Sequence, residues 1–255
     1  MVRHIKLVAV DLDHTILHDD KTLSSFTVEV FRRLRHCEVS TCVLTTRQKA
    51  SAEALCSQLA CCGTAFCNGA IVSVDGSVIA RHSLNQQSAR DFLHDIADYP
   101  CSVTCSDTVY TNFKTHYSIQ VDSWSQLEGQ ELLRILLYKP PQELLEQLTA
   151  TSYADLYIQH LEHNDIVAVS RLATKERALE ILMEHWGIYS KETAAFGDDF
   201  NDIGFIALAG TGIAVQNAEE QVRLTADVLC ASNNEDGPAL WLNEYVLRPL
   251  NAEVR

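Results

Sequence analysis

Three aspartates that follow strand-like segments are the clearest chemical signal in the sequence. Asp11 and Asp13 come directly after the apolar run at residues 5–10, and Asp198 follows a second short run at residues 193–196. Residues two apart on an extended chain point the same way, so the side chains of Asp11 and Asp13 can converge. Three carboxylates repel one another unless a cation or a shared proton intervenes, and carboxylate oxygens together with water suit Mg²⁺. The pattern therefore predicts a magnesium site.

Lys175 and a pair of threonines predict that this metal acts beside a phosphate group. Lys175 stands in the first turn of an expected helix, where a cation opposes the positive end of the helix dipole. The arrangement becomes favourable when an anion is bound there. Thr45 and Thr46 follow the strand-like run at residues 39–44 and can supply hydroxyl and backbone donors to phosphate oxygens. A site with Mg²⁺ on one side and lysine on another is shaped for a phosphate.

The elements that must position these side chains form a doubly wound α/β core. Strand-like apolar runs alternate with amphipathic helices over residues 1–81, and the alternation resumes over residues 169–255. Residues 82–168 instead mix expected hairpins with two helices, which predicts a separate α+β domain inserted into the core. In such cores ligands bind outside the carboxyl ends of the parallel strands, where the polar clusters stand. The predicted fold is a Rossmann-like parallel-sheet core with an inserted α+β domain.

Length and composition limit the class of protein. The 255 residues are 47% hydrophobic, which is enough for a substantial core, and the net charge of −14 argues against nucleic acid or an anionic membrane as a partner. No apolar run approaches the roughly 18 residues of a membrane span, and the first residues lack the apolar stretch of a signal peptide. The nine cysteines, an odd number, are expected to be reduced thiols of a cytoplasmic protein.

Four motifs, in order along the chain, resemble those of the haloacid dehalogenase superfamily of phosphohydrolases. They are VAVDLDHTIL, VLTTR, a lysine preceding a helix, and FGDDFNDIGFI. The segments NGAIVSVDG, GTGIAVQNA and NNEDGPALWL are similar to the Cof-type, sugar-phosphatase-like branch. That branch inserts a large α/β cap between the second and third motifs, so the resemblance implies that residues 82–168 form a cap domain. Thr46 stands where this branch commonly has glycine, a departure that bears on how closely the backbone approaches phosphate.

The resemblance also implies a role for each matching residue. Asp11 would be the nucleophile and a Mg²⁺ ligand, and Asp13 the general acid and base with its backbone carbonyl on the metal. Asp198 would complete the metal ligands, Lys175 would steady the phosphate and the nucleophile, and Asp202 would support the metal or the lysine from outside the ligand set. The residues implied to bind the substrate phosphate, besides Lys175, are Leu12, Thr45, Thr46 and Asn201.

The predicted reaction is hydrolysis of a phosphate monoester in two displacements, through an aspartyl-phosphate on Asp11. Asp13, expected to be protonated beside the other carboxylates, gives its proton to the leaving oxygen and then takes one from water. The expected substrate is a small phosphorylated metabolite such as a sugar phosphate, the cofactor is Mg²⁺, and the protein is a monomer or a weak homodimer. Two alternatives stay open: a phosphomutase, and a metabolite-binding regulator with weak catalysis.

Overall fold

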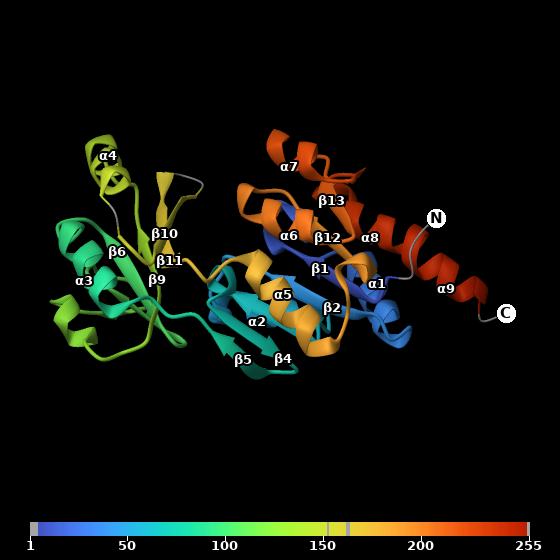
Figure 1. Ribbon diagram of the computed structural model, residues 1–255, viewed down its shortest axis with the longest axis horizontal. Coiled ribbons are helices and arrows are strands. Elements are labelled where there is room, and N and C mark those ends of the chain that lie inside the picture. The colour runs from blue at the N-terminus through green and yellow to red at the C-terminus, as the bar shows by residue number, and fades with distance from the viewer. Residues whose placement is uncertain (1–4, 152, 162–163, 254–255) are drawn as a thin grey trace. The chain divides into compact units, whose positions relative to one another are not determined.

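Strand β1 (Leu7–Val10) lies inside a sheet between β2 (Ser40–Leu44) and β12 (Thr193–Gly197), and all three strands are parallel. The other strands of this sheet are β3 (Gly63–Phe66), β4 (Ile71–Val74), β5 (Ser77–Arg81), β13 (Thr211–Val215) and β14 (Val228–Cys230). The computed structural model describes residues 5–151, 153–161 and 164–253, and there the sheet order is β14-β13-β12-β1-β2-β3-β4-β5 (Figure 1).

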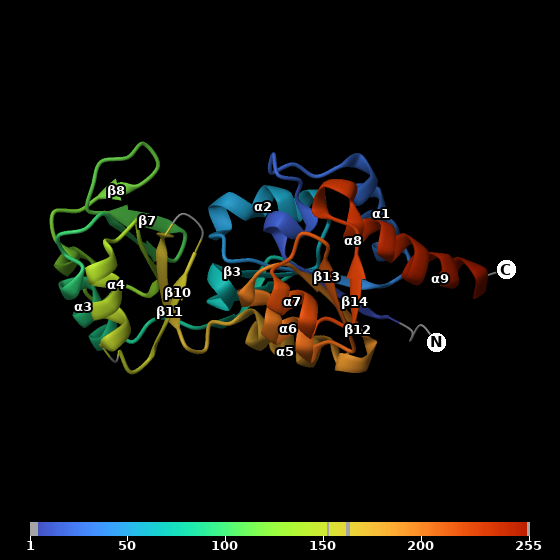
Figure 2. The same cartoon turned by 90° about the horizontal axis from the view of Figure 1, so that it is seen from above.

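Alternate residues of β1 face two different hydrophobic layers, so helices cover both faces of the sheet. Val8 and Val10 belong to one buried cluster, whereas Leu7 and Ala9 belong to another. The first layer is packed by α1 (Ser25–His36), α2 (Lys49–Gln58) and α8 (Gly237–Leu242), and the second by α5 (Lys175–Trp186), α6 (Ile203–Leu208) and α7 (Glu220–Thr225). Figure 2 shows these two groups of helices on opposite sides of the sheet. The prediction of a doubly wound α/β fold is confirmed.

A second sheet lies between the two halves of this core in the sequence. Its strands are β6 (Cys101–Cys105), β7 (Thr108–Thr111), β8 (Ile119–Gln120), β9 (Leu132–Leu137), β10 (Leu156–His160) and β11 (Ile166–Ser170). They are ordered β10-β11-β9-β6-β7-β8, and the pairs are antiparallel except for β7 with β8. Helices α3 (Gln86–Asp95) and α4 (Gln142–Ala150) contribute Phe92 and Leu144 to the buried cluster on one face of this sheet.

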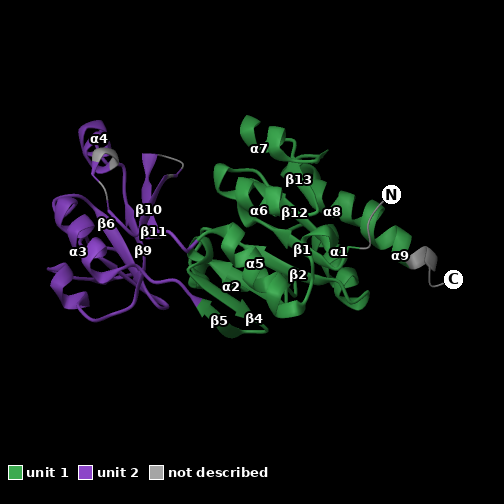
Figure 3. Cartoon of the chain, in the orientation of Figure 1, with its two compact units in different colours: residues 1–80, 174–255 green, residues 81–173 purple. Residues whose placement is uncertain are grey.

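The chain divides into two units, coloured separately in Figure 3. Unit 1 comprises residues 1–80 and 174–255, and unit 2 comprises residues 81–173. The sequence placed the second boundary after residue 168, which would cut β11. The structure keeps β11 whole in unit 2, because this strand pairs along most of its length with β9 and β10.

Two further features concern the helices and the thiols. Among the described residues, no helix has both the length and the apolar character needed to cross a membrane. The nine cysteines all carry free thiols, and burial raises the pKa of several of them, for example that of Cys101 to about 12. Such buried thiols are poor nucleophiles at neutral pH, because the thiolate is the reactive form.

Candidate active site

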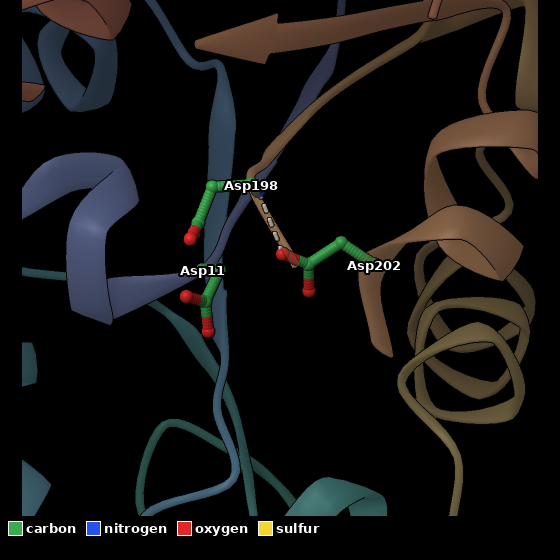
Figure 4. A group of neighbouring side chains, drawn as sticks. All are labelled: Asp11, Asp198 and Asp202. Atoms are coloured by element: carbon green, nitrogen blue, oxygen red, sulfur yellow. Dashed lines mark hydrogen bonds between the residues drawn. The ribbon is translucent and has the colours of Figure 1, made fainter. Parts of the chain in front are cut away.

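Three carboxylates meet where β1 and β12 end. Asp11 follows β1, Asp198 follows β12, and Asp202 lies in a short helical turn just beyond Asp198. One carboxylate oxygen from each residue lies within 4.8 Å of the others, and Figure 4 shows the three side chains converging. Because adjacent parallel strands end at the same edge of a sheet, residues 187 positions apart (198 − 11) become neighbours.

The turn after β12 is shaped so that Asp202 can fold back onto the strand end. The second oxygen of Asp202, Oδ2, accepts hydrogen bonds from the backbone amides of Asp198 at 2.8 Å and Asp199 at 3.1 Å. Gly197 permits this approach, since a Cβ atom at that position would lie 2.5 Å from Cβ of Asp202. A glycine is therefore required directly before Asp198 for steric reasons, and not for an unusual backbone conformation.

Lys175 connects two of the three carboxylates. Its Nζ atom donates to Oδ1 of Asp11 and to Oδ1 of Asp202, both at 2.6 Å, and its side chain is only 2% exposed. Lys175 begins α5, and the preceding Thr174 caps that helix by accepting a hydrogen bond from the amide of Arg177. Burial alone would lower the pKa of Lys175, but the two carboxylates outweigh burial and raise it. The lysine is therefore a permanent cation.

The three carboxylates carry more negative charge than one lysine offsets. Burial is the main cause that raises the pKa of Asp198 to about 9, and the charges of Asp11 and Asp202 add to it. Burial also raises the pKa of Asp11 to about 7, although Lys175 acts in the opposite direction. The hydroxyl of Thr15 donates a short hydrogen bond to Asp198. The cluster consequently favours a bound proton or a bound cation.

Asp13 lies outside this carboxylate cluster, because two cations hold its side chain. Arg47 donates from Nε and Nη2 to the two carboxylate oxygens of Asp13 at 2.6 Å each, and Nζ of Lys21 lies 3.1 Å from Oδ1. Burial would raise the pKa of Asp13, but the hydrogen bonds and charges of Arg47 and Lys21 outweigh it and lower the pKa. The expectation that neighbouring carboxylates keep Asp13 protonated is wrong for this geometry. Here Asp13 is an anion.

A left-handed residue between Asp13 and Thr15 sends these two side chains in different directions. His14 has φ 56° and ψ 1°, a conformation that non-glycine residues adopt at a cost. Its carbonyl oxygen accepts a hydrogen bond of 2.8 Å from Nδ2 of Asn217, which fixes the turn. As a result, Thr15 reaches Asp198 while Asp13 reaches Arg47.

The two threonines predicted to bind phosphate follow β2, the strand beside β1. Thr45 is fully buried, its amide donates to the carbonyl of Ala65 at 2.9 Å, and its hydroxyl accepts from the amide of Arg47 at 3.1 Å. Thr46 is partly buried. The Thr45 hydroxyl keeps its own proton for a ligand oxygen, because the bond to Arg47 uses only a lone pair.

Leu12 and Asn201 differ in what they can offer a ligand. The side chain of Leu12 lies in the hydrophobic core, so only its backbone amide is suited to bind a phosphate oxygen. Nδ2 of Asn201 donates to Asp199 at 3.3 Å, whereas its Oδ1 atom is buried with no hydrogen-bond partner among the described residues. A buried acceptor of this kind requires a donor from outside the protein chain, such as water or a substrate hydroxyl.

Sequence reasoning missed Thr15, Lys21 and Arg47. Arg47 belongs to the polar cluster that follows β2, but no pattern connects it with Asp13, which is 34 residues earlier. Thr15 lies two residues beyond Asp13, and this spacing alone does not reveal that it bonds Asp198. The contact of Arg47 with Asp13 and that of Thr15 with Asp198 both depend on the conformation of loops.

Comparisons with known proteins agree with this fold. The sequence matches the haloacid dehalogenase-like hydrolase family over residues 8–242. It is 24% identical to the 5-amino-6-(5-phospho-D-ribitylamino)uracil phosphatase YitU of Bacillus subtilis, with 94% of this chain and 97% of that protein covered. It is also 24% identical to the pyridoxal phosphate phosphatase YbhA of Escherichia coli, with 95% and 99% covered.

The three-dimensional comparison extends over the same length. A crystal structure of a haloacid dehalogenase-like hydrolase from Bacteroides thetaiotaomicron superposes with a TM-score of 0.85 at 19% identity, covering 94% of this chain and 98% of that one. Because the family match spans nearly the whole sequence, this protein belongs to the haloacid dehalogenase-like hydrolases.

Proposed function

We propose that this hydrolase is a Mg²⁺-dependent phosphatase that removes phosphate from a small phosphorylated metabolite, such as a sugar phosphate, through an aspartyl-phosphate on Asp11. Its enzyme class, a hydrolase of phosphate monoesters, follows from the family and from relatives of matching length that are phosphatases. The metal, the nucleophile and the substrate class are the proposal. The observation that carries it is the buried Lys175, bonded to both Asp11 and Asp202 beside Asp198.

The carboxylate cluster fits a magnesium ion by the chemistry of its donors. Its oxygens are the hard ligands that Mg²⁺ prefers. Burial is the main cause of the raised pKa values of Asp11 and Asp198, and the charge of the neighbouring carboxylates adds to it, so a bound cation would favour the ionised forms. Asp11 and Asp198 would hold the ion together with the backbone carbonyl of Asp13, while Asp202 holds Lys175. When bound, Mg²⁺ offsets the charge of the phosphate and of the attacking carboxylate.

In the first displacement, a carboxylate oxygen of Asp11 attacks phosphorus. The new oxygen–phosphorus bond forms as the ester bond to the leaving oxygen breaks, and that oxygen takes a proton from Asp13. Lys175 keeps Asp11 oriented and stays positive throughout, because the raised pKa prevents its deprotonation. Asp13 must leave the two nitrogens of Arg47 and gain a proton before it can act as the acid.

In the second displacement, water attacks the phosphorus of the aspartyl-phosphate. The ionised form of Asp13, which the structure favours, accepts the proton of that water. The bond between Asp11 and phosphorus breaks, which releases inorganic phosphate and regenerates the Asp11 carboxylate. Arg47 and Lys21 thus favour the base form of Asp13, which the second step uses.

Turnover of p-nitrophenyl phosphate tests the metal and the nucleophile together. We expect activity with Mg²⁺, loss of it in EDTA, and a decrease of at least about 10³-fold in Asp11→Asn. The matched control is Asp98→Asn, which changes an exposed aspartate of unit 2 and should keep wild-type activity. Equal activity in all four measurements would rule out the proposal.

A panel of metabolite phosphates then tests the substrate class. Release of inorganic phosphate from monophosphates is expected, with peptide mapping after a rapid acid quench locating a phosphoryl group on Asp11. Isomerised product without free phosphate would instead identify a phosphomutase, and tight binding without any turnover would identify a regulator.

A further inference from the structure

Two segments of unit 1 have no role in the reaction proposed above, although they resemble the Cof-type branch. They are GTGIAVQNA, which contains Asn217, and NNEDGPALWL, which contains Asn233. Both asparagines reach the turn at residues 12–17, which follows β1 and carries Asp13 and Thr15. These hydrogen bonds join residues that are 203 and 216 positions apart, so the contact is created by the fold and not by local sequence.

Asn233 holds this turn at two points. It is 2% exposed, and its Nδ2 atom donates to the carbonyl oxygen of Leu17 at 2.9 Å and to Oδ1 of Asp19 at 3.0 Å. Its backbone amide donates to Oδ1 of Asn217 at 3.0 Å, and Nδ2 of Asn217 donates to the carbonyl oxygen of His14 at 2.8 Å. Asn233 therefore holds the end of the turn directly and the middle of the turn through Asn217.

The segment that carries Asn233 is itself fixed by local contacts. The hydroxyl of Ser232 donates to Oε2 of Glu235 at 2.8 Å, and the backbone amide of Ser232 donates to the same oxygen at 3.3 Å. Gly237 allows the chain to fold back closely, since a Cβ atom at that position would lie 1.8 Å from the carbonyl oxygen of Ala231. Asn233 is thus presented to the turn by a backbone that has little freedom.

The conformation that the two asparagines hold is costly for the chain and decides where two side chains of the site point. His14, at φ 56°, lies in the left-handed region, which a residue with a Cβ atom adopts at a cost. This conformation sends the hydroxyl of Thr15 to Asp198. It sends the carboxylate of Asp13 to Arg47. A turn that relaxed would therefore disturb both contacts together.

We propose that Asn233 and Asn217 are positioning residues that hold the left-handed turn at His14. They thereby keep Asp13 in place for proton transfer and Thr15 in place beside the metal ligands. Both asparagines act through backbone carbonyl groups of the turn and not through the carboxylates of the site. The inference rests on the proposed function, from which it takes the role of Asp13 and the position of the metal.

Hydrolysis of p-nitrophenyl phosphate and binding of Mg²⁺, measured on the full-length protein, test the proposal. Because a small misplacement of a catalytic group can cost about 10²-fold, we expect kcat to fall about 10²-fold in Asn233→Leu and about 10-fold in Asn217→Ala, with KM changed less than about 3-fold. In titration calorimetry without substrate, both variants should bind Mg²⁺ about 10-fold more weakly, since Thr15 and the carbonyl of Asp13 belong to the turn. Asn217 is exposed, so its truncation should leave the fold intact.

The matched control is Asn234→Ala, at the position next to Asn233. Nδ2 of Asn234 donates to Oδ2 of Asp19 at 2.8 Å, and Oδ1 of Asn234 accepts from the amide of Asp19 at 3.1 Å. Within the described part of the chain, Asn234 makes no side-chain hydrogen bond to residues 12–17. In this variant kcat and the affinity for Mg²⁺ should therefore stay within about 2-fold of the wild type.

A double-mutant cycle with His14→Gly separates positioning of the turn from a general loss of stability. Because glycine adopts a positive φ without the steric cost, the decrease in kcat caused by Asn217→Ala should be several-fold smaller in the His14→Gly background than in the wild type. Additive effects in this cycle, or wild-type kcat and Mg²⁺ affinity in Asn217→Ala, would overturn the proposal. A wild type without Mg²⁺-dependent turnover would instead overturn the proposed function itself, and this inference with it.

Discussion

Unit 1 and unit 2 each contain a cationic side chain that is at least partly buried, but the two side chains have opposite surroundings. Lys175 of unit 1 is 2% exposed and donates to two carboxylates at 2.6 Å. Arg134 of unit 2 is partly buried and has no hydrogen-bond or ion-pair partner within the described residues. Removing one partner of a buried ion pair lowers the free energy of unfolding, because the other charge stays buried without a counter-ion. Removing a partly buried charge that has no counter-ion should instead raise it. The comparison therefore predicts mutational effects of opposite sign.

The largest effect is expected for Lys175→Met. The substitution leaves Asp11 and Asp202 buried without their cation, so at pH 8 in EDTA the free energy of unfolding should fall by about 3–5 kcal/mol. Urea unfolding of the wild type and the variant measures this loss. Lys191→Met, at an exposed position, is the control. A loss below about 1 kcal/mol would show that the two carboxylates do not depend on Lys175 and would remove the contrast with Arg134.

The charge of the cluster can also be tested through pH and Mg²⁺. The pKa of Asp198 is raised to about 9 in the folded state, so the folded protein retains a proton that the unfolded chain loses near pH 4. In EDTA, the contribution of Asp198 to the free energy of unfolding should therefore be greatest below pH 4. It should be lost progressively as the pH rises from there to about 9. In Asp198→Asn the decline should be shallower, because the amide does not ionise.

Magnesium should reverse this loss in the wild type. At pH 8 and a concentration 100 times its Kd, Mg²⁺ should stabilise the wild type by about 2.7 kcal/mol and the Asp198→Asn variant far less. Thermal unfolding with Mg²⁺ or EDTA measures both effects, and Asp98→Asn should behave like the wild type. Equal stabilisation of the two proteins would exclude Asp198 from the metal ligands.

The sequence could predict the parts of the site that depend on regular secondary structure. Asp11 and Asp198 follow apolar runs, and adjacent parallel strands bring their ends together. The same reasoning failed for Asp13, whose partner Arg47 is selected by the left-handed turn at His14. That turn was not predicted, because a histidine gives no sign of the positive φ that a glycine would indicate.

Unit 2 illustrates a second limit. Its strands other than β8, and both helices, could be located from patterns, because the hydrophobic runs and the break at Pro140 and Pro141 are local. The pairing of β9 with both β6 and β11 could not, since register between distant strands leaves no mark in either strand alone. The position of Arg134 opposite Thr104 and Val169 became visible only from that register.

A third cation, Arg47, gives an intermediate case between Lys175 and Arg134. Arg47 is paired with Asp13 through two hydrogen bonds, but its side chain is 21% exposed. In Arg47→Gln the pKa of Asp13 should rise, so the acid form persists to higher pH and the alkaline limb of the kcat profile should move upward by about one pH unit. Arg177→Gln, which removes an exposed arginine, is the control. An unchanged profile would mean that Arg47 does not set the protonation of Asp13.

The smallest effect, and the one of opposite sign, is expected for Arg134→Met. Methionine keeps most of the side-chain volume and removes a guanidinium that has no partner among the described residues, so the free energy of unfolding should rise by up to about 1 kcal/mol. Urea unfolding of the wild type and the variant in EDTA gives the sign of the change. Destabilisation by more than about 1 kcal/mol would instead mean that Arg134 supports the fold of unit 2, and the contrast between the two cations would disappear.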